Sequence, residues 1–91
     1  MPIRFELSSL LREYCGVAAD LTLEATSLRA ALAEIERRHP ALYRSVCNET
    51  GAVRPHVNLF VNRDNARDRQ GLDTPLQSGD VVTILQAVSG G

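Results

Sequence analysis

The chain ends in two glycines, and this end carries the clearest chemical signal in the sequence. Gly90 and Gly91 have no side chains, so the Gly91 carboxylate is unhindered and the adjoining backbone can adopt conformations that residues with a Cβ resist. With glycine at about 7% of residues, two terminal glycines occur by chance in roughly one chain in 200. A terminus that simply frays is the alternative. We expect Gly91 to be the reactive residue, with Val88, Ser89 and Gly90 as the tail that a partner binds.

The other residues with chemical potential form no recognisable catalytic set. Cys15 and Cys47 lie far apart, and His39 and His56 fit no metal-ligand spacing. The sequence has neither a glycine-rich nucleotide loop nor a Gly-x-Ser-x-Gly nucleophile motif. All ten basic residues are arginine, which excludes Schiff-base chemistry on this chain and isopeptide attachment to its own side chains. We therefore expect a non-enzyme that binds no metal and no cofactor itself.

The length and net charge of the chain exclude further classes of function. The 91 residues suit a single small domain, and 44% hydrophobic residues suffice for one core. Ten basic and 11 acidic residues give a net charge of -1, which is unsuited to a nucleic-acid partner. Because no stretch approaches the roughly 20 apolar residues that span a bilayer, we expect no membrane association. The two unpaired thiols indicate a reducing, cytoplasmic location.

Four segments show the two-residue period of strands. They are residues 2–8, 20–25, 56–62 and 81–88. In the third, Val57, Leu59 and Val61 form the core row and Phe60 lies on the other face. In the last, both rows are apolar, which indicates a central strand or one whose outer face a partner covers.

One long helix is predicted between these strands. It begins at Thr26 or Ser27, which can cap it, and ends at residue 38 or 39 because Pro40 blocks continuation. Shorter helical turns are predicted at 10–14, at 41–46 and, within a loop over 63–79, at 74–76. A mixed sheet packed on one main helix is the economical arrangement, an α+β fold in two layers.

Over essentially its whole length, and most clearly from Pro55 onward, the chain resembles the MoaD/ThiS family of ubiquitin-like sulfur carriers. The resemblance rests on Val57–Asn62, Gly71–Leu76, Ser78–Leu85 and the terminal Val88–Gly91, while the first half matches more loosely. It implies the β-grasp fold, with four or five strands around the helix. We expect a β-grasp domain over residues 1–86 and a flexible tail over 87–91.

The resemblance also implies a mechanism. An E1-like adenylyltransferase would use ATP and magnesium to adenylate the Gly91 carboxylate, and a sulfur donor such as a sulfurtransferase would displace AMP to leave a thiocarboxylate. The carrier itself would supply the tail and a docking face. By position we place on that face Phe60, Val81, Thr83 and Leu85, with Arg67 as a further docking residue. The alternative for Phe60 is burial under the 63–79 loop, and for the charged run 63–69 a merely solvated loop.

Four roles for the chain and its tail stay open. Length and the Val-Asn-x-x-Val-Asn strand favour the longer carriers of cysteine biosynthesis, whose acceptor would be a PLP-dependent cysteine synthase. The small subunit of molybdopterin synthase, bound to its large subunit, is an alternative. The others are a protein modifier conjugated to lysines of other proteins and an interaction domain with an inert tail.

Overall fold

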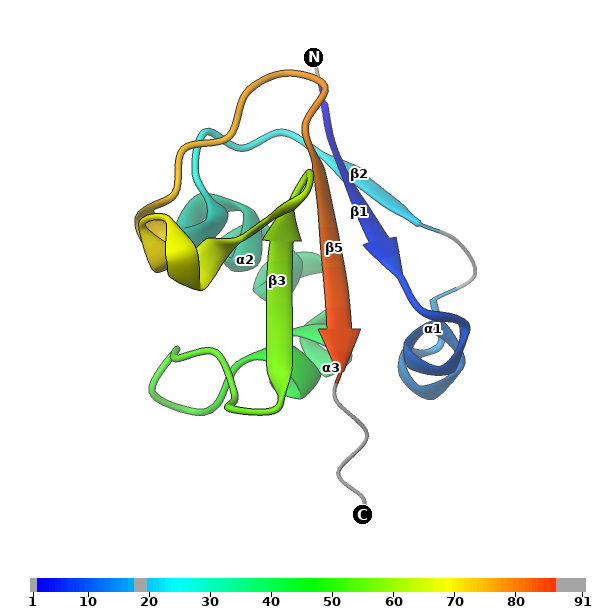
Figure 1. The fold of residues 1–91 in the computed structure, drawn as a ribbon. Helices are drawn as coiled ribbons and strands as arrows, with labels where there is room; N and C mark the ends of the chain where they lie inside the picture. The colour runs from blue at the N-terminus through cyan, green and yellow to red at the C-terminus, as the bar shows by residue number, and fades with distance from the viewer. Residues whose placement is uncertain (1, 18–19, 87–91) are drawn as a thin grey trace.

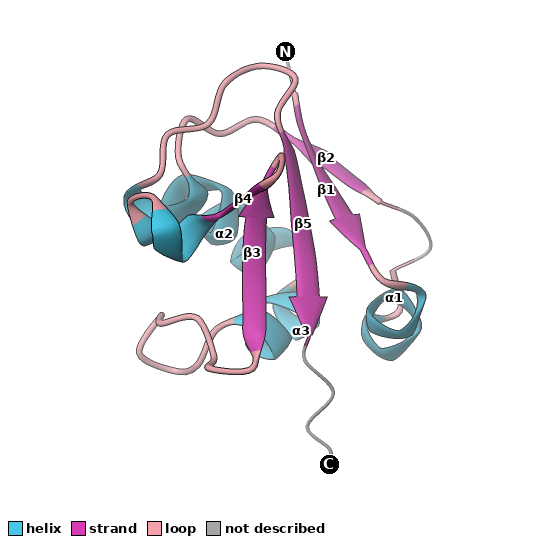
Figure 2. Ribbon diagram, viewed as in Figure 1, coloured by secondary structure: helices cyan, strands magenta, loops and turns pink. Residues whose placement is uncertain are grey.

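The computed structural model describes residues 2–17 and 20–86, which form two layers. Figures 1 and 2 show helices α2 and α3 behind a sheet whose front face is open. In chain order the elements are β1 (Ile3–Leu7), α1 (Ser9–Cys15), β2 (Leu21–Leu23), α2 (Leu28–Arg38), α3 (Pro40–Val46), β3 (Val57–Val61), β4 (Asp64–Asn65), the 3₁₀ turns η1 (Ala66–Asp68) and η2 (Gly71–Asp73), and β5 (Val81–Gln86). The predicted α+β architecture is confirmed.

The last strand, β5, lies at the centre of the sheet. The strand order is β2-β1-β5-β3-β4, and β5 pairs in parallel with β1 and antiparallel with β3. Both backbone edges of β5 are therefore hydrogen-bonded to neighbouring strands. The element that leads into the C-terminal tail is held on two sides.

Local sequence signals set the helix boundaries. Ser8 accepts a hydrogen bond from the Leu11 amide at 3.1 Å and starts α1, and Gly16, with a φ of 69°, ends it. Ser27 starts α2 in the same way by accepting from the Ala30 amide at 3.1 Å. Pro40 ends α2 and is also the first residue of α3, a position that needs no amide hydrogen.

The core lies between the sheet and the helices. Period-two rows of β1, β3 and β5 meet the apolar stripe of α2, and the fully buried large side chains include Ile3, Phe5, Leu28, Ile35, Leu42, Val46, Val57, Val61, Val82 and Ile84. The predicted core row of residues 57, 59 and 61 is confirmed. Burial of this apolar surface is the main stabilising contribution.

The structure confirms one short helical prediction and corrects another. The helical turn predicted at 41–46 is present as α3, which buries Leu42 and Val46 beside the main helix α2. The helical turn predicted at 74–76 is wrong. Thr74 Oγ donates to the Gly71 carbonyl at 2.7 Å and closes the preceding turn, while Pro75 forms a β-bridge with Ser27.

The strands are shorter than the sequence patterns predicted, and the 63–79 segment, predicted as a loop, contains regular elements. The second strand spans only Leu21–Leu23, and the 63–79 segment holds β4 and both 3₁₀ turns. The last strand is described to Gln86, so the part predicted at 87–88, like the tail at 87–91, lies outside the described residues. Within the described ranges no helix is long and apolar enough to cross a membrane.

Burial of Cys47 predicts an alkaline loss of stability. Both thiols are free, with Cys15 half-buried and Cys47 buried, and burial raises the pKa of the Cys47 thiol. In the unfolded chain this thiol ionises at a pKa near 8.5, before the folded one does, so its contribution to stability is complete below that pH and is lost as pH rises further. We expect the free energy of unfolding of wild type to fall more steeply above pH 8.5 than that of Cys47→Ala. Parallel pH profiles from denaturant titrations would contradict this.

Candidate docking face and tail exit

The C-terminal tail follows the central strand of the sheet in sequence. Gly91 and the tail residues Val88, Ser89 and Gly90 lie outside the described residues, and their roles stay predictions. The strand that leads into them is fixed, since Gln86 pairs with Val57 at the end of the β3–β5 ladder. Residues 87–91 can span at most about 16 to 18 Å beyond that point. If Gly91 is the reacting residue, as the sequence predicts, a partner's active site must approach this end of the sheet.

Four of the predicted docking residues share the open face of the sheet. Val81 and Thr83 are half-buried and Leu85 is 44% exposed, while Val82 and Ile84 face the core. Phe60 of β3 lies directly opposite Thr83, and Asn58 lies opposite Leu85. Because side chains alternate along strands, this register places Phe60, Val81, Thr83 and Leu85 on one surface, which we call the open-face row. Their part in docking stays a prediction.

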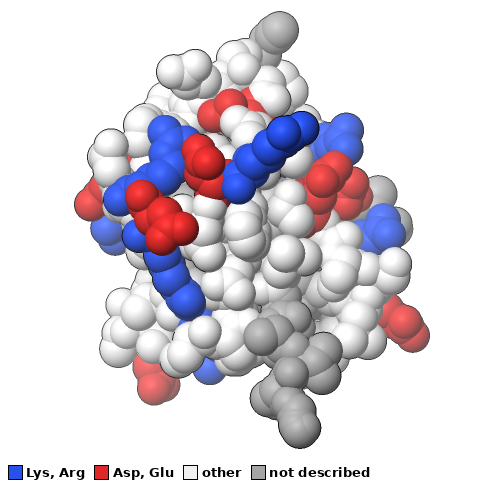
Figure 3. All heavy atoms as spheres, in the orientation of Figure 1, with Lys and Arg blue, Asp and Glu red and all other residues white. Residues whose placement is uncertain are grey.

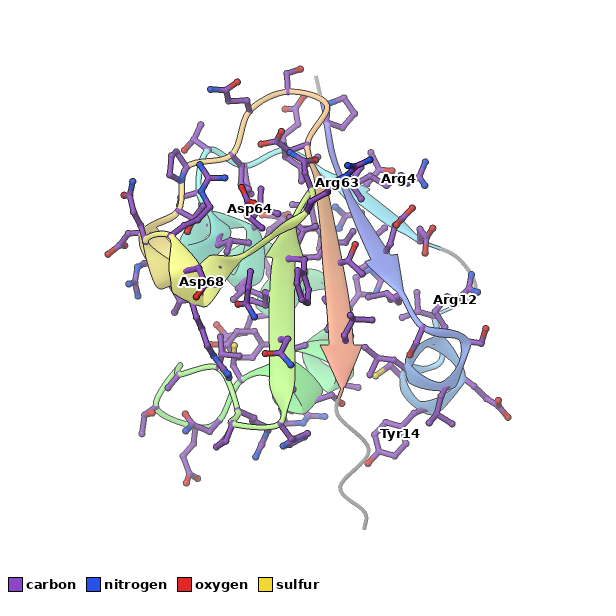
Figure 4. All side chains as sticks on the ribbon, in the orientation of Figure 1. Arg4, Arg12, Tyr14, Arg63, Asp64 and Asp68 are labelled. Carbon is purple, nitrogen blue, oxygen red and sulfur yellow. The ribbon has the colours of Figure 1, made fainter. Side chains whose placement is uncertain are left out.

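Charges of both signs border the open-face row. Arg4 and Glu6 of β1 form an ion pair on the same face, and Arg69 lies 3.9 Å from Asp64. Figure 3 shows charged side chains gathered over one part of this face beside a mostly uncharged area, and Figure 4 shows Arg63, Asp64 and Asp68 beyond the end of β3 and along its edge. The pairs balance each other, so the face attracts neither polyanions nor polycations strongly.

The 63–69 segment forms a wall beside Phe60. Phe60 is half-buried and lines a shallow hollow together with Arg63, Asp64, Asp68 and Arg69. Part of the ring is therefore accessible from the open face. The charged run is an ordered border of the row, with β4 and η1 in it, as well as a solvated surface.

Arg67 has an internal role that its sequence context did not predict. Its guanidinium donates to the carbonyl oxygens of Val57 at 3.0 Å and Pro55 at 3.3 Å. These contacts tie η1 to the start of β3, on the side of β3 that faces away from β5. The structure thus places Arg67 apart from the open-face row, and its part in docking stays a prediction.

Asn62 and Asp80 form a clamp at the start of β5 that sequence reasoning missed. The Asn62 side chain accepts from the Val81 amide and donates to Asp80 Oδ1, both at 3.1 Å, while Asp80 Oδ2 accepts from the Gln77 amide at 2.8 Å. Asn62 has a φ of 57°, a left-handed conformation that asparagine tolerates better than most residues. The second Asn of the Val-Asn-x-x-Val-Asn pattern and the Gly-Asp motif were its available signals. The clamp fixes the register of the strand that carries the tail.

The clamp gives a stability prediction with a built-in control. Asn62→Ala removes both side-chain hydrogen bonds and places alanine in a left-handed conformation, so we expect unfolding to become easier by about 2 kcal/mol. Asn62→Gly loses the same hydrogen bonds but tolerates the backbone, and should cost about 1 kcal/mol. Denaturant unfolding measures both. Equal losses in the two variants would show that the backbone conformation contributes nothing.

Comparison with known proteins decides the family. The sequence profile described as the ThiS family matches residues 9–91. The chain belongs to the ThiS family. It is 28% identical over 93 residues to the sulfur carrier protein CysO of Mycobacterium tuberculosis, with 100% of both chains covered. The crystal structure of that protein matches with a TM-score of 0.82 at 26% identity, covering 94% of this chain and 99% of the other.

Two further likenesses bear on partners of this ThiS-family chain. A crystal structure of the Amycolatopsis orientalis BexX/CysO complex contains a chain that matches with a TM-score of 0.85 at 25% identity, covering 98% of this chain and 99% of that one. The small archaeal modifier protein 3 of Haloferax volcanii is 40% identical over 43 residues, 47% of each chain. The ubiquitin-like β-grasp fold and the preference for the longer carriers are confirmed by these matches.

Proposed function

We propose that this protein is a sulfur carrier that holds sulfur as a thiocarboxylate at Gly91. The observation that carries the proposal is the full-length match to a sulfur carrier, together with a Gly-Gly terminus that follows the central strand. The open-face row beside that strand supplies a surface for the enzymes that use the tail. The chain is a co-substrate of those enzymes and performs no catalysis itself.

The chemistry requires activation because a carboxylate is a poor electrophile. In the proposed sequence an E1-like enzyme, with its own magnesium, joins the Gly91 carboxylate to the α-phosphate of ATP and releases pyrophosphate. Sulfide, or the persulfide of a donor such as a sulfurtransferase, then attacks the carbonyl carbon, and the C–O bond breaks with release of AMP. Sulfide leaves the thiocarboxylate directly, whereas a persulfide leaves an acyl disulfide that a thiol must reduce to the thiocarboxylate. The product is an anionic sulfur nucleophile held covalently on the protein.

The acceptor we propose is a PLP-dependent cysteine synthase, in which the carrier's sulfur replaces the leaving group of an O-activated serine. The new C–S bond forms, the serine C–O bond breaks, and the activating group departs with its oxygen. The Amycolatopsis orientalis structure, a complex of BexX with CysO, supports the view that carriers of this shape dock on a second protein. PLP would belong to the acceptor. The product of this acceptor, cysteine, carries a free thiol, and this chain has two free thiols of its own. Both suit a reducing, cytoplasmic setting.

Reconstitution tests the proposal. The protein is incubated with the E1-like enzyme of its own genome, ATP, magnesium and sulfide, and its intact mass is followed. We expect replacement of one oxygen by one sulfur, dependent on ATP. If the protein keeps the mass of its free-carboxylate form and no pyrophosphate is released, the carrier assignment is overturned.

A role as protein modifier is the second candidate, favoured by the partial match to a small archaeal modifier protein. The test is a search for conjugates on lysines of other proteins. Because the last arginine is Arg69 and the chain has no lysine, trypsin would leave the whole Gln70–Gly91 segment on the target. A Ser89→Arg variant leaves only Gly-Gly, a remnant that mass spectrometry reads directly. Lysines carrying this remnant in cells that express the variant would establish the modifier role.

A further inference from the structure

A groove separate from the open-face row lies between α1, α3 and the segment before β3. It has a volume of about 620 Å³ and is lined by Leu10, Tyr14, Arg44, Ser45, Arg54 and His56, among others. We call it the tail-side groove. The proposed function assigns it no role.

The groove holds two of the most exposed apolar side chains described. Leu10 is 69% and Tyr14 81% exposed, whereas Leu11, the neighbouring leucine of α1, is 1% exposed and fills the core. Leu10 and Tyr14 are four residues apart on a helix, so they lie on one side of it. Since α1 is attached to the core through Leu11, these two side chains bury little of their surface on folding. Exposed aromatic and leucine side chains at a groove are typical anchors for a protein partner.

The charge of the groove selects the kind of partner. Arg44 and Arg54 contribute two guanidinium groups, and none of the described residues that line the groove carries a carboxylate. Arg54 is held in place because its Nε donates to the Arg44 carbonyl at 2.8 Å. The chain as a whole has a net charge of -1, so this local excess of positive charge is a departure from the average surface. Guanidinium groups beside apolar surface suit a carboxylate next to an apolar side chain.

The groove lies at the same end of the sheet as the last described residue of β5. His56 directly precedes Val57, which pairs with Gln86, the last described residue of β5. Figure 1 shows α1 and α3 at the end of the sheet where β5 ends, and Figure 4 shows Tyr14 projecting from α1 at that end. Arg63 lies at the opposite end of β3. An enzyme that takes Gly91 into its active site must cover the end that carries the groove.

We propose that the tail-side groove binds a segment of the partner enzyme that presents a carboxylate beside an aromatic or apolar side chain. That the partner is an enzyme rests on the proposed function, whereas the chemistry of the segment rests on the groove alone. Tyr14 and Leu10 contact the apolar group, and Arg44 and Arg54 bind the carboxylate. The groove thereby orients the carrier as the tail enters.

A peptide titration tests the groove without any enzyme. The probe is acetyl-Asp-Glu-Phe-Glu-Asp-amide, compared with the uncharged acetyl-Ser-Gln-Phe-Gln-Ser-amide and with inorganic phosphate, each added to the isotope-labelled protein. We expect saturable amide shifts at Leu10, Tyr14, Arg44 and His56 with the acidic peptide only. The double variant Tyr14→Ser/Arg44→Glu should weaken binding at least about tenfold, the loss of roughly 1.4 kcal/mol, whereas Arg63→Glu, with the same charge change at the other end, should not.

The other results each overturn the proposal. Equal shifts with phosphate would make the groove a site for small anions. Concentration-dependent shifts in the protein alone, abolished by Tyr14→Ser, would place a second copy of the chain there. No shifts at the groove would leave it without a ligand of this class.

The enzyme arm separates this inference from the proposed function. With the E1-like enzyme and the acceptor, the double variant should raise KM for the carrier in at least one reaction while kcat is retained. If wild type is activated and the variant matches it in both reactions, the groove proposal fails and the carrier assignment stands. If wild type is not activated at all, the carrier assignment fails, and the peptide titration still decides the groove.

Discussion

Deletion of Gly91 is expected to reduce activation by the E1-like enzyme at least about 100-fold while leaving the fold intact. The shortened chain still ends in an unhindered glycine carboxylate, that of Gly90, but this carboxylate lies one residue, about 3.5 Å, short of the adenylation site. Misplacement of a reacting atom by as little as 1 Å can cost about 100-fold in rate. Pyrophosphate release at saturating ATP measures the loss. The free energy of unfolding should not change, because glycine has no side chain to bury.

Gly91→Ala is the matched control for this deletion. It keeps the full length of the tail and adds one Cβ. The variant therefore distinguishes the effect of tail length from that of steric obstruction in the active-site channel of the activating enzyme. We expect an intermediate rate, because the added methyl group obstructs a narrow channel without shortening the tail. Activation of the deletion variant at the wild-type rate would show that the terminal residue is not the one activated.

Leu85→Asp is expected to raise KM for the carrier at least about tenfold in the reaction of the activating enzyme. Leu85 is the most exposed member of the open-face row and lies in the strand that leads to the tail. A partner that covers the row would have to bury an unpaired carboxylate and lose an apolar contact, which together exceed the roughly 1.4 kcal/mol of a tenfold change. Phe60→Asp tests the neighbouring strand of the same row.

Ala30→Asp controls for the added charge. Ala30 is exposed in the first turn of α2, the helix behind the sheet, where an acidic side chain is tolerated well. We expect its KM to match wild type. If Leu85→Asp and Phe60→Asp also match wild type, the open-face row is not the docking face, and surfaces such as the tail-side groove must carry recognition instead.

Periodicity in the sequence predicted which strand residues face the core. Ile3, Phe5 and Leu7 alternate with Arg4 and Glu6, and the same alternation separates Phe60 from its buried neighbours. A row that faces away from the core follows from such a pattern, because the core already uses the other face of the strand. The capping residue Ser27 and Pro40 likewise defined the ends of α2.

Features set by tertiary contacts were not accessible from the pattern. The residues at 74–76 carry turn-forming types, yet the bridge of Pro75 to Ser27 holds them extended. In α1 the pattern Leu10-Leu11-x-x-Tyr14 does not say which residue is buried, and only packing shows that Leu11 is. The hydrogen bonds of Arg67 to the Pro55 and Val57 carbonyls could not be predicted, because these partners lie 12 and 10 residues earlier in the chain and only the fold brings them together.

The most direct test of the account is the intact mass of this protein isolated from its own cells, compared with that of a variant lacking Gly91. The account predicts a species in the wild type heavier by the difference between one sulfur and one oxygen, absent from the truncated variant. Localisation of that difference to the terminal residue would assign the thiocarboxylate to Gly91. A wild-type protein that carries only the free carboxylate under conditions of active sulfur metabolism, with no conjugates on other proteins, would contradict the account.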